Sequence, residues 1–237
     1  EIADTSLKIV GFAVSPRGDL LVVDHGSGLY RIIPTPPTGK LLDFPRKLSE
    51  TGIFASVPGY KVAPGVVPYS VNSPGWMDGA TAQRHLALPG DVTLPFGGNR
   101  GWELREGSVI IQTLSIGDHR IETRLMTRQN NEWAGYSYLW NKEQTEAELV
   151  GKKGLDIEVE ADGKKHPWRI PGRAECMSCH SRADNFLLGI TADQLNRDHG
   201  YKDGPAPQLQ TLKKLGVLSG YKDQNPGPLA NPYDEKQ

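Results

Sequence analysis

The stretch Arg120-Ile-Glu-Thr-Arg-Leu-Met-Thr-Arg decides the fold class, because apolar and polar side chains alternate along it with a period of two. One face of such a strand carries Ile121, Thr123 and Leu125, and the other carries Arg120, Glu122, Arg124 and Arg128. This alternation is typical of an antiparallel strand that has one face on a core.

Three further stretches alternate in the same way. They are Ser108-Val-Ile-Ile-Gln-Thr-Leu-Ser-Ile, Glu132-Trp-Ala-Gly-Tyr-Ser-Tyr-Leu-Trp and Leu155-Asp-Ile-Glu-Val-Glu. Together they predict a mainly β fold built on an antiparallel sheet, and we expect a β-sandwich of jelly-roll-like character. Residues 57–95 are rich in Pro and Gly with little periodicity, so we predict an ordered loop that wraps over the sheet.

Composition excludes some classes of partner. The chain has 237 residues, and its 27 basic and 28 acidic side chains nearly cancel, which leaves no basic surface for nucleic acid. No apolar run approaches the roughly 20 residues that span a bilayer, so we expect no transmembrane segment. Glu1 opens the chain without a signal peptide, which predicts a mature or excised piece.

The two cysteines of the chain lie in one motif, Cys176-Met-Ser-Cys-His. This spacing is typical of c-type haem attachment, in which two thiols bond covalently to the haem and the adjacent histidine binds its iron. We therefore predict one covalent haem c held by Cys176 and Cys179, with His180 as the proximal iron ligand. A small α-helical segment near the C-terminus would carry it.

Three other interpretations of the motif are weaker. A zinc site needs about four ligands, so His166 and His199 would have to complete it. A thioredoxin-type pair sits within an alternating strand and helix pattern, whereas the residues before this motif are all strand. A disulfide across two intervening residues is strained.

The second axial ligand is less well marked than the first. His199 is the first choice, because we expect it at the end of the helix that follows the motif, from where it could fold over the opposite haem face. An iron with five ligands and an open site is the alternative. The other candidate ligands are His25, His85, His119, His166, Met77 and Met126.

Other side chains near the motif suggest further roles. Arg173 and Arg182 flank it and could neutralise the haem propionates. Four aromatic residues lie on one predicted strand: Trp133, Tyr136, Tyr138 and Trp140. They could line one side of the haem pocket, although packing in the core of the sandwich is the more ordinary role.

Three regions follow from these patterns. Residues 1–44 contain three short strands joined by turns, like a propeller blade, and end in the proline-rich linker 34–39. Residues 45–171 form the sandwich region, with a short helix at 45–50. Residues 172–237 form the haem-attachment region, with one helix beginning near Thr191 and another over 208–218.

Several long motifs, in this order, resemble bacterial exported c-type cytochromes that often carry two haems. The resemblance covers about residues 48–218 and rests on Gly65-Val-Val-Pro-Tyr-Ser-Val-Asn-Ser-Pro-Gly-Trp-Met-Asp-Gly-Ala, Arg120-Ile-Glu-Thr-Arg-Leu-Met-Thr-Arg-Gln, Glu132-Trp-Ala-Gly-Tyr-Ser-Tyr-Leu-Trp-Asn, Arg173-Ala-Glu-Cys-Met-Ser-Cys-His-Ser and Gln194-Leu-Asn-Arg-Asp-His. A second attachment motif usually follows in that family, which suggests that this chain is a fragment or a single-haem relative.

The first region adds a second resemblance. Its segment Val23-Asp-His-Gly-Ser-Gly-Leu-Tyr-Arg is similar to the closing blade of PQQ-dependent sugar dehydrogenase-like propellers, which can be fused to such cytochromes. The resemblance implies a redox partner protein or fused domain, either a PQQ-dependent dehydrogenase or another cytochrome.

We therefore expect an electron-transfer module, not an enzyme by itself, in the periplasm or otherwise outside the cytoplasm. A haem enzyme or gas-binding sensor with an open distal site is the main alternative. A carbohydrate-binding or docking module with a structural haem is the third class.

Overall fold

The structure is a computed structural model. It describes residues 5, 7–26, 28–33, 44–90, 92–96, 102–161, 163–181, 185–222 and 229–234. The chain divides into two compact units, Glu1–Phe44 and Pro45–Gln237. The predicted linker at 34–39 lies outside the described residues.

The first unit is a three-stranded antiparallel sheet, as the sequence predicts. Its strands are β1 (Ile9–Val14), β2 (Leu20–Asp24) and β3 (Gly28–Arg31), in that order across the sheet. Only Val22 and Asp24 of these strands are buried, while Phe12, Val14 and Leu29 are mostly exposed. The described residues of this unit therefore bury little apolar surface among themselves.

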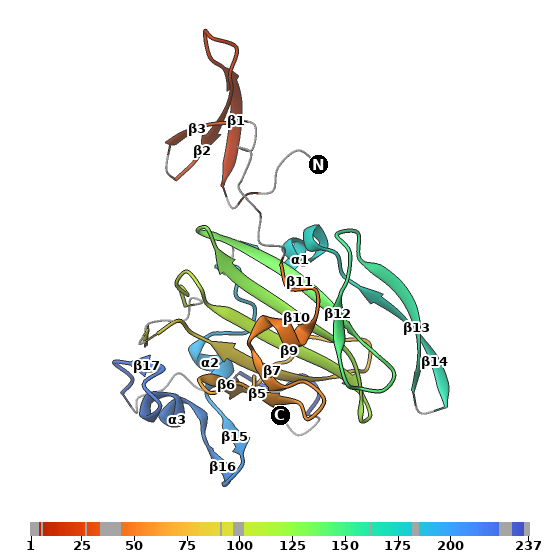
Figure 1. Cartoon of the computed structure of the whole chain (residues 1–237). Helices are drawn as coiled ribbons and strands as arrows, with labels where there is room; N and C mark the ends of the chain where they lie inside the picture. Colours follow the sequence, from red (N-terminus) through yellow and green to blue (C-terminus); the bar gives the residue numbers. More distant parts are fainter. Residues whose placement is uncertain are drawn as a thin grey trace. The chain divides into compact units, whose positions relative to one another are not determined.

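The second unit is built on a six-stranded antiparallel sheet with the order β12-β11-β10-β9-β7-β6 (Figure 1). Its strands are β6 (Val66–Tyr69), β7 (Thr81–Ala87), β9 (Val109–Ile116), β10 (His119–Gln129), β11 (Glu132–Trp140) and β12 (Ala147–Leu149). The β10–β11 loop consists of Asn130 and Asn131, whose φ angles are 54° and 61°. Positive φ at both positions suits the right-handed twist of a two-residue hairpin, and Asn tolerates it well. The predicted mainly β fold is confirmed.

The prediction of a loop over residues 57–95 is wrong for β6 and β7. β7 pairs with β9 along its length and with β6 on its other side, so it lies inside the sheet. Its sequence does not alternate clearly between apolar and polar residues, because the partly buried Arg84 and the buried His85 precede Leu86. Pro68 is tolerated in β6 because this strand is at the edge of the sheet.

Short two-stranded sheets surround the six-stranded one. They pair β4 (Phe54–Ser56) with β5 (Lys61–Val62), β8 (Leu94–Pro95) with β17 (Leu218–Ser219), β13 (Leu155–Ala161) with β14 (Lys164–Ile170), and β15 (Asp198–Tyr201) with β16 (Gly204–Pro207). The sequence placed residues 155–160 in the main sheet, but they form a separate hairpin, because residues 164–170 supply a full-length partner for them.

The helices of the described chain are short. They are the 3-10 helix η1 (Leu48–Thr51) and the α-helices α1 (Arg173–Cys179), α2 (Ala192–Leu195) and α3 (Gln208–Lys214). Thr191 begins α2 as predicted, since its side chain accepts a hydrogen bond from the Gln194 amide. None of these helices is long and apolar enough to span a bilayer.

The two faces of the main sheet are covered by different segments. We call the face that carries Arg124, Met126 and Gly135 the α1 face, because Cys176 of α1 lies against Gly135. A large core cluster packs on this face and includes Leu187, Leu195, and Leu209 and Leu212 of α3. On the opposite face, the Tyr138 hydroxyl donates to the Pro45 carbonyl beside η1. The jelly-roll-like sandwich stays a prediction.

Candidate functional site

The cysteine motif lies on α1, and one close backbone approach and two hydrogen bonds fix where this helix begins. A Cβ at Gly172, the residue before α1, would lie 2.3 Å from the Lys152 carbonyl oxygen, so only glycine fits there. The Gly172 amide donates to Glu175 Oε2 at 2.6 Å, and Arg169 donates to the same carboxylate at 2.9 Å. The end of the β13–β14 hairpin therefore holds the start of α1.

Cys176 packs directly on the main sheet. A Cβ at Gly135 of β11 would lie 2.5 Å from Cys176 Cβ and 2.7 Å from its Sγ, so glycine at this position makes room for the cysteine. Cys176 is half-buried, Cys179 is exposed, and both thiols are free. Burial raises the pKa of the Cys176 thiol, while the positive charge of Arg124 opposes that rise.

His180 follows α1 directly, and its imidazole is held by the chain beyond the helix. The Nδ1 atom lies 2.8 Å from the Phe186 carbonyl oxygen. Because a carbonyl oxygen only accepts, Nδ1 carries the proton and Nε2 keeps a lone pair. Among the described residues, Nε2 has no hydrogen-bond partner. Burial also lowers the pKa of His180, which favours the neutral ring that binds metal.

The loop that supplies this carbonyl has an unusual backbone. Asn185 and Phe186 both adopt positive φ angles, 48° and 63°. Asn tolerates this conformation, whereas an aromatic residue seldom does. Phe186 packs against the core cluster that contains Cys176 and Leu187. Core packing thus keeps the Phe186 carbonyl directed at the His180 ring.

A buried ion pair lies on the α1 face. Arg124 is bonded to Glu122, whose side chain is fully buried and also accepts from Trp168 Nε1 at 3.1 Å. Burial raises the pKa of Glu122, and Arg124 opposes that shift. Arg124 also lowers the pKa of both Cys176 and His180. The alternation of the strand placed Glu122 and Arg124 on one face but did not reveal that α1 would approach that face.

Arg173 has a partner other than the one predicted. Its guanidinium lies 4.8 Å from the centre of the Tyr136 ring, at cation–π distance. Contact with a haem propionate stays a prediction for Arg173. Arg182 lies outside the described residues.

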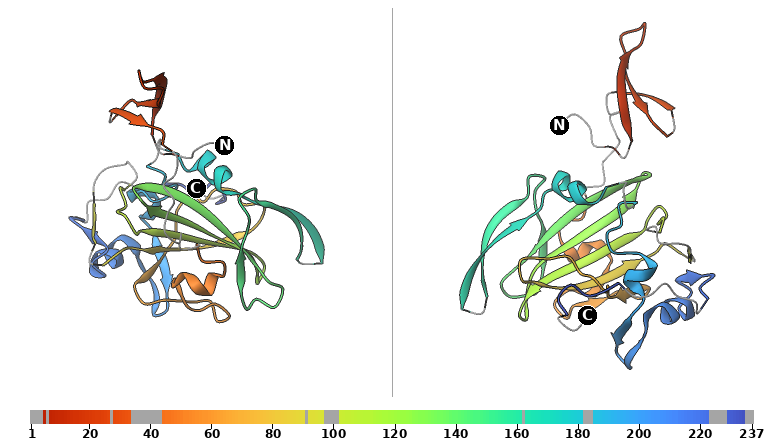
Figure 2. Two further views of the ribbon diagram at one scale, coloured as in Figure 1. Left: turned by 45° about the horizontal axis from the view of Figure 1, so that its top comes forward. Right: turned by 180° about the vertical axis from the view of Figure 1, so that it is seen from behind.

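His199 is not placed beside His180. The predicted helix ends at Leu195, and His199 lies on β15, where its Nδ1 is 2.7 Å from Ser70 Oγ. β15 and α1 lie toward different ends of the second unit in both figures (Figures 1 and 2). The charge of His199 also helps to lower the pKa of His85, after burial as the larger cause. Asn72 Nδ2 donates to the Asp193 carbonyl within α2 and to the Asn196 carbonyl directly after it, where the helix ends.

Two methionines lie nearer to the cysteine motif than His199 does. Met126 packs in the same cluster as Cys176, and its Sδ would lie 3.2 Å from a Cβ at Gly135. Met77 Sδ accepts a hydrogen bond from Arg124 Nη1 at 3.9 Å. The remaining candidates are spread over the chain, with His25 in the first unit, His119 on β10 and His166 on β14.

The aromatic residues of β11 do not form one wall. Trp133 packs in the core cluster of the α1 face. Tyr136, Tyr138 and Trp140 alternate to the opposite face, where Trp140 Nε1 donates to Thr123 Oγ1 at 2.9 Å. Core packing therefore accounts for most of these rings, as expected.

The motif brings together two free thiols and a neutral imidazole with an unprotonated Nε2, and this donor set fits a covalently attached haem. Within the described part of the chain, no three His, Cys, Asp or Glu side chains gather closely enough to hold a metal ion. Neither the family models, nor the curated proteins, nor the solved structures with which the chain was compared give a match.

Proposed function

We propose that this chain is the electron-transfer module of an exported c-type cytochrome, with one haem attached through Cys176 and Cys179. His180 would be the proximal iron ligand. The haem would supply one-electron exchange between its ferric and ferrous states. The resemblance to exported, often diheme cytochromes belongs to this proposal, as does the small helical haem segment.

The observation that carries the proposal is the hydrogen bond from His180 Nδ1 to the Phe186 carbonyl. Histidine ligands of metals almost always donate their second ring nitrogen to a carbonyl or carboxylate, which fixes the tautomer and the ring orientation. Here that bond occurs at the histidine of the Cys-Met-Ser-Cys-His motif. Neither a thioredoxin-type pair nor a disulfide would need it.

Each residue of the site has a separate task in the proposed module. Cys176, half-buried against Gly135, and Cys179, exposed at the end of α1, would anchor the cofactor by thioether bonds. The Phe186 carbonyl orients the His180 ring.

The partners and the compartment follow from the cofactor. We propose a donor that is either a PQQ-dependent dehydrogenase, separate or fused, or another cytochrome, and a periplasmic or other extracytoplasmic location. The exposed apolar side chains of β1–β3 support this, because a propeller blade buries such residues only against its neighbours. The jelly-roll-like sandwich around the six-stranded sheet is the scaffold in this proposal.

A second function is favoured by the placement of His199. With its Nδ1 at Ser70 and its strand away from α1, His199 would not supply a second axial ligand in this proposal. An open iron site would make the domain a haem enzyme or a gas-binding sensor. Carbon monoxide binding by the reduced protein at micromolar gas concentrations, together with a high-spin spectrum, would select this function over electron transfer.

The attachment is tested by expressing the chain in an exporting host that attaches haem c and staining denaturing gels for haem. We expect a haem-positive band at 26.0 kDa that loses its stain in the Cys176→Ser, Cys179→Ser double variant. His166→Ala is the matched control and should keep the stain. A wild-type band without haem would refute the attachment.

A further inference from the structure

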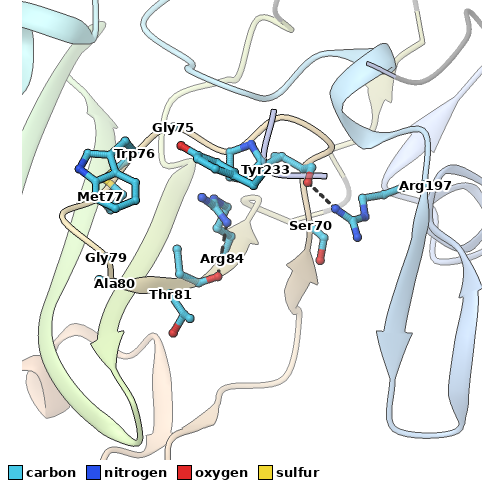
Figure 3. Close-up of a pocket in the computed structure, with 13 residues that line it drawn as sticks. Ser70, Gly75, Trp76, Met77, Gly79, Ala80, Thr81, Arg84, Arg197 and Tyr233 are labelled. Carbon is cyan, nitrogen blue, oxygen red and sulfur yellow. Dashed lines mark hydrogen bonds between the residues drawn. The ribbon is translucent and has the colours of Figure 1, made fainter. Parts of the chain in front are cut away.

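An open pocket of about 370 Å³ lies beside the loop between β6 and β7 (Figure 3). Residues of that loop and of β7 line it, together with Arg197 and Tyr233. Trp76 and Met77 form one side, and Arg197 stands on the other. Arg84 rises between them from β7, and the ring of Tyr233 lies beside it. The pocket therefore combines two guanidinium groups with aromatic and apolar side chains.

The pocket carries positive charge that no carboxylate among its described lining residues balances. The lining residues include no Asp or Glu. Arg84 Nη1 donates to the Ala82 carbonyl and Arg197 Nη1 to the Val71 carbonyl, and neither arginine has an ion pair within the part of the chain that the structure describes. Burial and the nearby charge of Arg197 both lower the pKa of Arg84. An anion between the two arginines would relieve this repulsion.

The apolar wall limits the kind of anion. The Trp76 and Tyr233 rings lie 6.4 Å apart between centres at 45°, and their side chains are largely exposed, with relative exposures of 69% and 52%. Exposed aromatic rings at the mouth of a pocket are typical surfaces for flat apolar groups. A small inorganic anion would leave these rings unused.

We propose that this pocket binds a carboxylate carried on a flat apolar body. The carboxylate is held by Arg84 and Arg197, because guanidinium groups match carboxylates in geometry and charge. The apolar body lies against Trp76, Tyr233 and Met77. Two ligands have this chemistry: a free aromatic carboxylate and a propionate group of the haem. The second ligand rests on the proposed function.

Calorimetric titration of the purified full chain with benzoate tests the pocket. We expect saturable binding of benzoate and none of benzamide, which has the same shape without the charge. Arg84→Gln and Arg197→Gln should each weaken benzoate binding by about tenfold, the typical cost of losing one hydrogen bond to a charged group. Arg105→Gln removes an exposed arginine outside the pocket and should leave binding unchanged.

The second arm separates the two ligands. If a haem propionate fills the pocket, benzoate does not bind, but Arg84→Gln and Arg197→Gln shift the midpoint potential and its pH dependence, whereas Arg105→Gln does not. Absence of benzoate binding together with an unshifted potential overturns the proposal. If the protein holds no haem, the benzoate titration alone decides, so failure of the haem and failure of the pocket are distinguished.

Discussion

The Nδ1 atom of His180 lies 2.8 Å from the carbonyl oxygen of Phe186, six residues further along the chain. This contact fixes the ring tautomer and leaves Nε2 available as a ligand. It depends on two residues with positive φ, Asn185 and Phe186, and on core packing of the Phe186 side chain. The backbone conformation of the loop after α1 therefore orients the His180 ring.

We predict that Gly135→Ala destabilises the second unit. The new Cβ would overlap Cys176 and crowd Met126 Sδ, and overpacking of this kind costs about 1–3 kcal/mol. Guanidinium denaturation measures the change. Gly151→Ala is the control, since nothing lies within 4 Å of its Cβ position. Equal stability of the two variants would show that α1 does not pack on β11 at Cys176.

We predict that His199→Ala leaves the absorption spectrum of the haem unchanged. In the structure His199 bonds Ser70 on β15, away from α1, so its removal should not alter the iron ligands. Met77→Ala and Met126→Ala are informative companions, because both methionines lie near the motif. A change from low-spin to high-spin bands in His199→Ala alone would instead restore His199 as the distal ligand.

We predict that His85 makes the protein less stable in acid. Burial lowers its pKa from 6.5 to about 4, with a contribution from His199. The unfolded chain therefore takes up a proton below pH 6.5 that the folded chain does not, so stability is fully present above pH 6.5 and is lost as the pH falls toward 4. At about 1.4 kcal/mol per pH unit, the loss is at most about 3.5 kcal/mol.

Denaturation of wild type and His85→Gln from pH 7 to pH 4 checks this dependence. The variant should lose less stability on acidification than the wild type. His25→Gln, at an exposed position of the first unit, should behave as the wild type. Parallel curves for wild type and His85→Gln would mean that His85 titrates normally in the fold.

The sequence predicted some of the strands well and failed on others for a physical reason. The period of two in the sequence located β9, β10 and β11, although their burial is nearly continuous because both faces of the sheet are covered. The two-residue Asn-Asn loop joins the last two. β7 was not predicted because the partly buried Arg84 and the buried His85 stand at positions where a strand of a covered sheet usually has apolar residues. Only pairing with β6 and β9, which is not local in sequence, identifies it as a strand.

Part of the candidate site could likewise be predicted from the sequence, and part could not. The motif itself is visible in the sequence, since its chemistry depends on short spacing. The Phe186 contact is not, because positive φ at a phenylalanine goes against local preference and is maintained by tertiary packing. The expected helix up to His199 is wrong because α2 ends after four residues and the chain turns into the β15–β16 hairpin.

The central claim, a haem bound covalently at Cys176 and Cys179, is tested most directly by one measurement. The purified protein is treated with alkaline pyridine and dithionite, and its absorption spectrum is recorded. We predict a pyridine haemochrome of the c type, with one haem per chain. A protein that gives no haemochrome, or whose haem is extracted by acidified acetone and is therefore not covalent, would contradict the claim.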